Sequence, residues 1–253
     1  PMRDGGTGPA RVSVYFGGTA HEMWTDSGLS VSYTGRHEVC ALREGAVYRA
    51  EAPVPARAGD VKADYNELAW SEELAASLNA GTAPALTRAY FAAAAAVAEA
   101  FSELWDIRDL PGRLPRELSG GYEALLIPET MRVLLDERRA SWEDARDITA
   151  RCFMLRVCEG SRDARVPLGA VSALQPRDAG LIRAINEKLC GRLWDAWPGD
   201  WQRIGENAVL RDGEVDLVTL CTACCGTIIC TKERRAGSLR AMYTLMPARF
   251  ADI

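Results

Sequence analysis

The stretch from Ala124 to Met154 constrains the fold most, because two helix signals follow one another there with almost no linker between them. Pro128 suits the first turn of a helix, where its missing N–H costs nothing, and Glu129 favours the positive end of the helix dipole. Met131 and Leu134 then repeat at the spacing of one buried helical face. We therefore expect a helix that starts near Pro128 and is buried on one side.

A second helix signal follows the charged run from Asp136 to Arg139, which we interpret as the solvated end of the first helix. Ser141 is a suitable N-cap, and Asp144 stands where a capping box has its Glu. The next apolar positions fall on one stripe of a helix. These positions are Trp142, Ala145, Ile148, Cys152 and Leu155.

Before this helix pair, the expected secondary structure changes from strands to helices near residue 60. Residues 11–51 alternate in the manner of four short strands in a meander, and residues 52–60 break the pattern with Pro53, Pro55 and Gly59. Helices are expected over 72–78, 84–105 and 178–197, and the alanine run 92–96 should let another element approach closely. Residues 110–121 read as a loop and 122–126 as extended. The spacing of apolar residues alone does not decide whether 215–230 is helix or strand.

Composition excludes several classes of protein. The net charge of −5 argues against a nucleic-acid-binding role, which needs a basic surface. We see no signal peptide and no apolar run long enough to span a membrane, so a cytoplasmic location is expected. The eight cysteines are expected to be reduced thiols, because a chain of this size does not need disulfides. Pro1 before Met2 suggests a residue left by tag cleavage, with the natural, short and complete protein starting at Met2.

The helix pair resembles the α-glucan phosphorylase family, whose chains carry I-P-E-x-M-R-x-L-x-D followed by x-W-x-x-A-x-x-I/V-T. Further likenesses follow in the family's order: Pro176-Arg177 with Ile185-Asn186, then Trp197-Pro198-Gly199-Asp200, and the segment from Asp212 to Cys221. Tyr90-Phe91 is similar to a Tyr-Phe pair that opens a helix in the family. The first matched set is Ile127, Pro128, Glu129, Met131, Arg132, Leu134, Asp136, Trp142, Ala145, Ile148 and Thr149.

The resemblance implies an α/β fold, with a partial Rossmann-like layer similar to the N-terminal domain of glycosyltransferase-B enzymes and a small antiparallel β portion at the N-terminus. We expect a frayed terminus over 1–10, a β-rich portion over 11–60 and a helix-rich portion over 61–253 that packs with it as one domain. The family's early strands have no counterpart here, which would expose a sheet edge. A homodimer or a phosphorylase-like partner covering that edge is therefore expected.

The resemblance also implies where substrate contacts should lie, and the expected side chains are absent. The family's N-D-T-H-P segment corresponds to Ser119, Gly120, Gly121, Tyr122 and Glu123, which keep none of its motif positions. Its Y-T-N-H-T segment corresponds to residues 155–159, without the histidine. The family's pyridoxal phosphate lysine belongs to a second domain with no counterpart. We therefore expect no cofactor and no phosphorolysis by this chain alone.

Several side chains remain candidates for a changed function. Tyr122, Glu123, Cys158 and Glu159 are the candidate catalytic groups, and Ser119, Gly120, Gly121 and Arg156 the candidate cleft lining. A nucleophilic Cys158 needs a base, and the two histidines, His21 and His37, lie far away in sequence. No metal site is predicted. Cys221, Cys224, Cys225 and Cys230 are interpreted as core residues, with zinc ligation and a reactive thiol as the alternatives.

Three functions stay open on this basis. The first is a non-phosphorolytic protein that binds a small molecule in a relined cleft. The second is a cofactor-independent enzyme, such as a lyase, isomerase or cyclase acting on a less polar substrate. The third is a scaffold subunit of a phosphorylase-like complex. An acidic group in an apolar pocket would favour the second, and a flat apolar surface patch would favour the third.

Overall fold

The computed structural model describes residues 10–26, 28–45, 47–51, 67–69, 83–114, 117–157 and 164–252. The N-terminal part is β-rich, as the alternation predicted, and includes one strand more than expected before residue 51. The helix predicted over 72–78 lies outside the described residues. The first strands are β1 (Arg11–Phe16), β2 (Thr19–Thr25), β3 (Gly28–Thr34), β4 (His37–Glu44) and β5 (Val47–Ala50).

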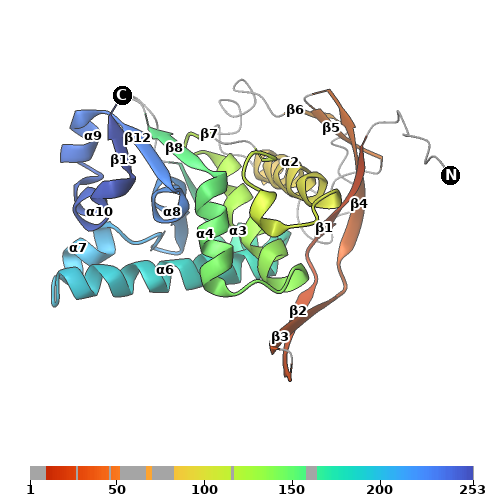
Figure 1. Ribbon diagram of the computed structural model, residues 1–253, viewed down its shortest axis with the longest axis horizontal. Helices are drawn as coiled ribbons and strands as arrows, with labels where there is room; N and C mark the ends of the chain where they lie inside the picture. Colours follow the sequence, from red (N-terminus) through yellow and green to blue (C-terminus); the bar gives the residue numbers. More distant parts are fainter. Residues whose placement is uncertain are drawn as a thin grey trace.

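The predicted meander differs in the length and number of its strands, because β1 continues into β2 and β3 into β4 in one antiparallel register, with Phe16 opposite His37 and Thr19 opposite Thr34. β1 pairs with β4, β4 with β5, and β5 with β6 (Glu67–Ala69), all antiparallel. β2 and β3 pair with each other as a ribbon that projects from the body (Figure 1). The pattern misled because β2 is exposed along most of its length and carries no alternation of buried and exposed residues. The sheet also extends past residue 60, the predicted boundary of the β-rich portion.

Helix α2 (Ala83–Ser102) packs across the N-terminal sheet. Its alanine run over 92–96 is buried, which allows the close approach that the sequence predicted. The rings of Phe16 and Tyr90 meet edge to face with centroids 5.2 Å apart. At the other end, the Tyr48 hydroxyl donates to Glu99 over 2.6 Å. Small side chains in the middle, a ring contact towards one end and a hydrogen bond at the other thus fix the helix on the sheet.

The predicted helix pair is confirmed. Helix α3 (Leu126–Arg132) continues as a π-helical turn, η3 (Val133–Glu137), and α4 (Trp142–Cys152) follows. The Ser141 hydroxyl accepts from the amide N–H of Asp144 over 3.0 Å, as an N-cap should. The preceding η2 (Tyr122–Leu125) is a 3-10 turn and not extended. The extended prediction was wrong because the side chain of Glu123 folds back on the Gly121 amide at 2.9 Å.

The part of the chain after α2 contains a parallel sheet, and the fold is α/β. Its strand order is β13-β12-β8-β7. The region 215–230 is a helix followed by a strand, α8 (Leu217–Cys224) and then β12, which explains why one period could not describe it. The strands are β7 (Glu117–Leu118), β8 (Met154–Val157), β12 (Thr227–Cys230) and β13 (Phe250–Asp252).

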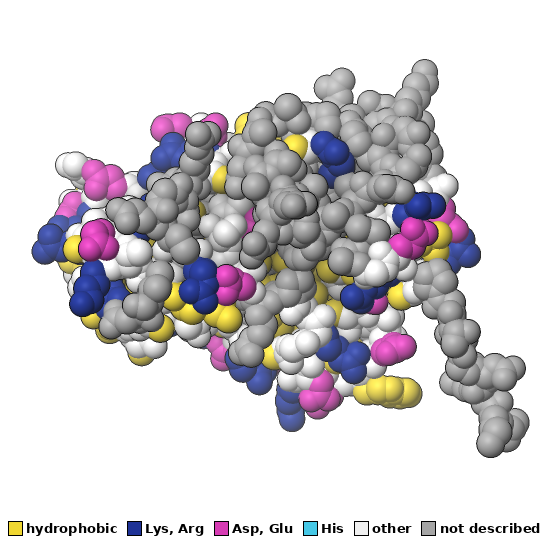
Figure 2. Space-filling view, turned by 90° about the horizontal axis from the view of Figure 1, so that it is seen from above, with side chains coloured by type: hydrophobic (Ala, Val, Ile, Leu, Met, Phe, Trp, Pro, Cys, Tyr) yellow, Lys and Arg dark blue, Asp and Glu magenta, His cyan; other side chains and the backbone are white. Residues whose placement is uncertain are grey.

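Helices and short strands surround this sheet, and one hydrophobic core runs from β1 through the helices to the C-terminal segment. Among the described helices, none combines the length and hydropathy needed to cross a bilayer. Figure 2 shows acidic and basic side chains close together over the described part of one face. The remaining elements are η1 (Ile107–Asp109), β9 (Arg165–Pro167), α5 (Leu168–Leu174), α6 (Pro176–Ala196), α7 (Trp201–Glu206), β10 (Leu210–Arg211), β11 (Glu214–Asp216), α9 (Lys232–Ala236), α10 (Arg240–Leu245) and η4 (Pro247–Arg249).

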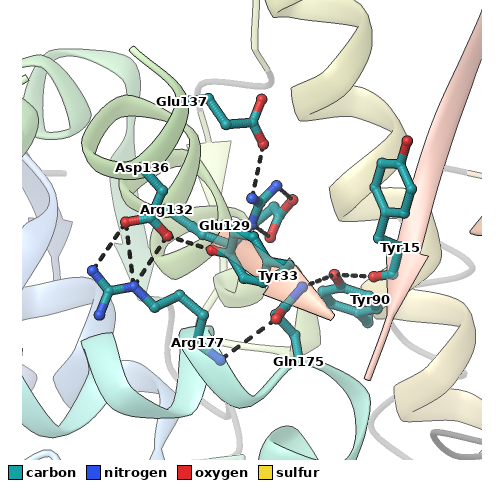
Figure 3. Close-up of polar contacts among 9 residues, drawn as sticks. All are labelled: Tyr15, Tyr33, Tyr90, Glu129, Arg132, Asp136, Glu137, Gln175 and Arg177. Carbon is teal, nitrogen blue, oxygen red and sulfur yellow. Dashed lines mark hydrogen bonds and ion pairs between the residues drawn. The ribbon is translucent and has the colours of Figure 1, made fainter. Parts of the chain in front are cut away.

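A buried polar network ties the ribbon to α3 and α6 (Figure 3). Arg132 makes two hydrogen bonds to Glu129, at 2.8 and 2.9 Å. Arg177 makes a bidentate pair with Asp136, at 2.9 and 3.0 Å, and Asp136 also accepts from the Tyr33 hydroxyl of β3. The Asp136 side chain is only 1% exposed, so its assignment to a solvated helix end was wrong. Tertiary partners bury it there.

Candidate functional site

The carboxyl edge of the parallel sheet carries the loop that the sequence singled out. β7 and β8 pair in parallel with Leu118 opposite Leu155, so the residues that follow both strands emerge at the same edge. In open α/β sheets, ligands bind outside this edge. Ser119 is exposed there, whereas residues 120–123 are buried. Cys158 and Glu159 lie outside the described residues.

Glu123 closes this loop with its own carboxylate. Its Oε1 accepts from the amide N–H of Ser119 at 2.7 Å, the Ser119 hydroxyl at 2.8 Å and the amide N–H of Gly121 at 2.9 Å. Its Oε2 is buried and has no hydrogen-bond partner among the described residues. Three hydrogen bonds to one oxygen hold the side chain in a fixed position, so Glu123 shapes the loop before it can act on any ligand.

Gly120 brings the same loop against α8. Its φ of +85° lies in the left-handed region, and a Cβ at this position would lie 2.5 Å from Cγ2 of Val218. Only glycine combines that backbone conformation with so close a contact. The loop and the first turn of α8 therefore pack directly on each other, and no ligand atom fits between Gly120 and Val218.

Two more predicted residues lie beside the loop. Tyr122 is buried, and its burial raises the pKa of the phenol above its usual value, so the hydroxyl stays protonated at neutral pH. Arg156 lies on β8 and pairs with Glu117 of β7 at 2.8 Å. Because both partners of this pair are more than one third exposed, the pair is weak and the guanidinium remains accessible. Ser119 and Arg156 are thus the exposed polar side chains among the described lining residues.

The structure does not bring the histidines to this edge. His21 lies on β2 and contacts the hydroxyl of Thr34 at 2.8 Å, within the projecting ribbon. His37 begins β4 of the N-terminal sheet. In Figure 1 the ribbon lies at the bottom of the molecule, while β7 and β8 lie near the top. A histidine base acting at the β7 loop therefore has no support in this arrangement.

The four clustered cysteines lie in the core. Cys221, Cys224, Cys225 and Cys230 are all buried and form no disulfide. Among the described residues, no group of histidine, cysteine or acidic side chains is placed to hold a metal ion. Burial raises the pKa of the Cys221 and Cys224 thiols well above their usual value, and Cys225 adds to the shift at Cys221. Protonated, buried thiols pack as small apolar side chains.

Neither lysine in the described part of the chain fits the Schiff base that pyridoxal phosphate forms. Such a lysine is desolvated or placed beside another cation that lowers its pKa. Lys188 and Lys232 are both exposed. Lys188 of α6 lies over the ring of Trp142 of α4, with Nζ 5.1 Å from the ring centroid. We therefore derive no chemical step through this cofactor.

Sequence reasoning missed the contact between Gly120 and Val218 and the tertiary role of Glu129, Arg132 and Asp136. The contacts of Gly120 and Asp136 have no local pattern, because Val218, Tyr33 and Arg177 come from elements far apart in the chain. Glu129 and Arg132 are three residues apart on one helix, and only the burial of their pair lacked a local signal. The glycine pair 120–121 was the one available signal, since two successive glycines often mark a close backbone approach. The motif residues were visible in the sequence as matches, but their partners were not.

Comparisons with known proteins bear on this fold. A family model described as carbohydrate phosphorylase matches residues 76–252. Glycogen phosphorylase of Bacillus subtilis (strain 168) is 37% identical over 101 residues, which cover 39% of this chain and 13% of that protein. The muscle forms of glycogen phosphorylase from Ovis aries and Homo sapiens are each 28% identical over 116 residues, covering 45% of this chain and 14% of theirs.

This chain therefore spans only a small part of the length of these relatives. The matched region contains the helix pair α3 and α4, the parallel sheet and the loop after β7. Because the family model matches well over half of the residues, the chain belongs to the carbohydrate phosphorylase family.

Proposed function

We propose that this chain is a non-phosphorolytic member of its family that binds a small molecule at the carboxyl edge of the parallel sheet. The main observation behind this proposal is that the Glu123 carboxylate accepts hydrogen bonds from its own loop. Its Oε1 takes three hydrogen bonds from the loop itself, at 2.7 to 2.9 Å. The segment that resembles the family's substrate-holding loop thus directs its acidic group inward, and a sugar hydroxyl gains no partner from it.

Two exposed groups remain for a ligand at this edge. The Ser119 hydroxyl donates to Glu123 at 2.8 Å and keeps lone pairs that can accept from a ligand. Among the described residues, the Arg156 guanidinium pairs with the exposed carboxylate of Glu117 and has further N–H groups to donate. A ligand with both a hydroxyl and an acceptor group, such as a carbonyl or a carboxylate, suits this pair.

A second function is favoured by one specific observation. The Oε2 atom of Glu123 is buried without a hydrogen-bond partner among the described residues, so one carboxylate oxygen is left to contact a substrate. Tyr122 follows the same glycines and carries a protonated hydroxyl. A cofactor-independent isomerase or lyase would use Glu123 as base and Tyr122 as acid on a substrate that enters beside Ser119.

The experiment has a catalytic and a binding part. Incubation of the chain with maltooligosaccharide, inorganic phosphate and pyridoxal phosphate should consume no phosphate. A thermal-shift screen of small hydroxy acids and sugars should find ligands whose affinity falls at least tenfold in Ser119→Ala and Arg156→Gln. The matched control is Arg108→Gln, which alters an exposed arginine away from this edge. Phosphate consumption, or equal losses in the control, contradicts the proposal.

The variant Glu123→Gln separates the two functions. The amide keeps an oxygen that can accept from Ser119 and Gly121, so ligand affinity should change little if the protein only binds. If the chain is an enzyme, turnover of a ligand found in the screen should fall by orders of magnitude while its binding persists.

A further inference from the structure

A cavity of about 640 Å³ lies at the end of the molecule where α7, the start of α8 and the α9–α10 connection meet. It is distinct from the β7 loop, because none of residues 119–123 lines it, although Val218 both lines it and contacts Gly120. Its volume lies within the usual range for small-molecule sites. Four arginines line it: Arg165, Arg203, Arg211 and Arg240.

The small antiparallel sheet β10-β11-β9 places two of these arginines on one carboxylate. Asp216 lies opposite Arg165 in the β11–β9 register, and it is 2% exposed. Its Oδ2 is paired with both Arg211 and Arg165, the latter at 3.8 Å. Its Oδ1 accepts from the Thr219 amide at 2.8 Å and so caps α8. Asp216 is therefore fixed, and two guanidinium groups share its single negative charge.

The lining is consequently short of negative charge. Among the described lining residues the carboxylates are Asp216 and Glu206, against four guanidinium groups, which gives this set a net charge of +2. Arg211 also has a buried Nε with no hydrogen-bond partner among the described residues. Arginines held close together in a partly enclosed space repel one another, and an anion between them removes that cost.

One wall of the same cavity is apolar. Val218, Leu239 and Met242 contribute side chains that are almost fully buried. Trp197 contributes an indole ring, with the Arg203 guanidinium 5.0 Å from its centroid. A bare inorganic ion would use the arginines but leave the partly exposed Trp197 ring uncovered. An organic molecule with an apolar body and a charged end would satisfy both.

We propose that this cavity binds a small organic anion, whose phosphate or carboxylate group contacts Arg165, Arg211 and Arg240 and whose apolar part contacts Trp197 and Val218. The planar donors of arginine suit both kinds of anion, since each presents paired oxygens for bidentate hydrogen bonds. The proposal does not depend on the function proposed for the β7 loop, because it uses different residues.

The test is isothermal titration of the full chain with four probes: phenyl phosphate, phthalate, inorganic phosphate and phenol. Phenyl phosphate and phthalate share an aromatic ring and differ in the anionic group, so the tighter of the two identifies the preferred chemistry. Inorganic phosphate should bind at least tenfold more weakly than phenyl phosphate, and phenol should not bind measurably. Raising the salt concentration should weaken binding of both aromatic anions.

The variants are Arg165→Gln and Arg240→Gln, both at exposed arginines whose loss should leave the chain folded. Each should lower the affinity for the preferred anion at least tenfold. The matched control is Arg49→Gln, an arginine of similar exposure on β5 that should leave the affinity unchanged. Absence of saturable binding by both aromatic anions overturns the proposal. So does an affinity that is equal in the cavity variants and the wild type.

Discussion

Two regions of this molecule contain clusters of arginines, and the two regions differ in their ratio of acidic to basic side chains. In the buried network, Arg132 and Arg177 each make a bidentate contact with one carboxylate and a further contact with a second, Glu137 or Glu22. In the cavity, two arginines share Asp216. The network has more acids than bases, and the cavity has more bases than acids.

This difference indicates what each region is for. The network offsets its excess of acidic side chains by protonation. Asp178 is fully buried beside Glu129, and its pKa is raised well above the usual value, first by burial and then by the Glu129 charge. A proton on Asp178 removes one negative charge from the interior. The cavity is open to solvent and contains no comparable internal correction among its described lining residues. The network is thus complete as a structural tie, while the cavity is completed by a ligand.

The largest expected effect comes from breaking the network at Arg132. Its side chain is 5% exposed, so Arg132→Met leaves Glu129 buried without its cation. Removing one partner of a buried pair costs about 3–5 kcal/mol, and we expect that loss in the free energy of unfolding measured in urea. Arg165→Gln, in the cavity, should cost less than about 1 kcal/mol.

The double variant Arg132→Met/Glu129→Gln sharpens this test. It removes the uncompensated carboxylate, so it should be more stable than Arg132→Met alone. Equal stability of the single and double variants would show that the lost packing of Arg132, and not its charge, stabilises the network.

The next effect tests the packed β7 loop. Gly120→Ala places a Cβ 2.5 Å from Val218 and keeps a positive φ, so we expect a loss of about 2–3 kcal/mol in the free energy of unfolding. Gly213→Ala has a φ of +81° and open space around its Cβ, so it measures backbone strain alone and should cost about 1 kcal/mol.

Adding Val218→Ala to Gly120→Ala removes the atom that the new Cβ would meet. The double variant should then cost less than the sum of the two single variants, because the clash is shared between them. Strict additivity would mean that the loop and α8 are not in direct contact, and the argument that no ligand fits between them would fail.

Local signals in the sequence predicted the helices well. Ser141 caps α4 as expected, and α6 spans Pro176–Ala196 and ends at the predicted proline-glycine turn. The alanine run on α2 is buried against the sheet. Capping and helical periodicity act over three or four residues, so a single sequence contains them in full. The resemblance to the phosphorylase family was confirmed on the same segments.

Contacts between distant segments were not predictable in this way. Asp136 reads as part of a charged, solvated run, but Tyr33 and Arg177 bury it from positions 103 and 41 residues away. The arginine-lined cavity collects side chains from β9, α7, β10 and α10, and the high arginine content alone gave no reason to group them. The candidate roles of Ser119, Arg156, Cys158 and Glu159 remain predictions, with the last two outside the described residues.

The smallest effect concerns the proton that balances the network. The folded-state pKa of Asp178 is raised, so the folded chain binds more protons than the unfolded chain above about pH 4. The free energy of unfolding should therefore fall as pH rises from about 4 towards neutrality, by up to about 1.4 kcal/mol per pH unit. Asp178→Asn needs no proton, so it should lose that slope and gain stability relative to the wild type as the pH rises towards 7.

Urea denaturation at several pH values between 4 and 8 measures this slope, and the exposed Asp147→Asn serves as the control that should keep the wild-type profile. The comparison must be made between profiles, because Glu129, Asp136 and Arg132 face Asp178 and shape the wild-type curve as well. Parallel profiles for the wild type and Asp178→Asn would show that Asp178 is ionised in the folded chain. The network would then keep its excess of negative charge, and the contrast between a self-balanced network and an unbalanced cavity would disappear.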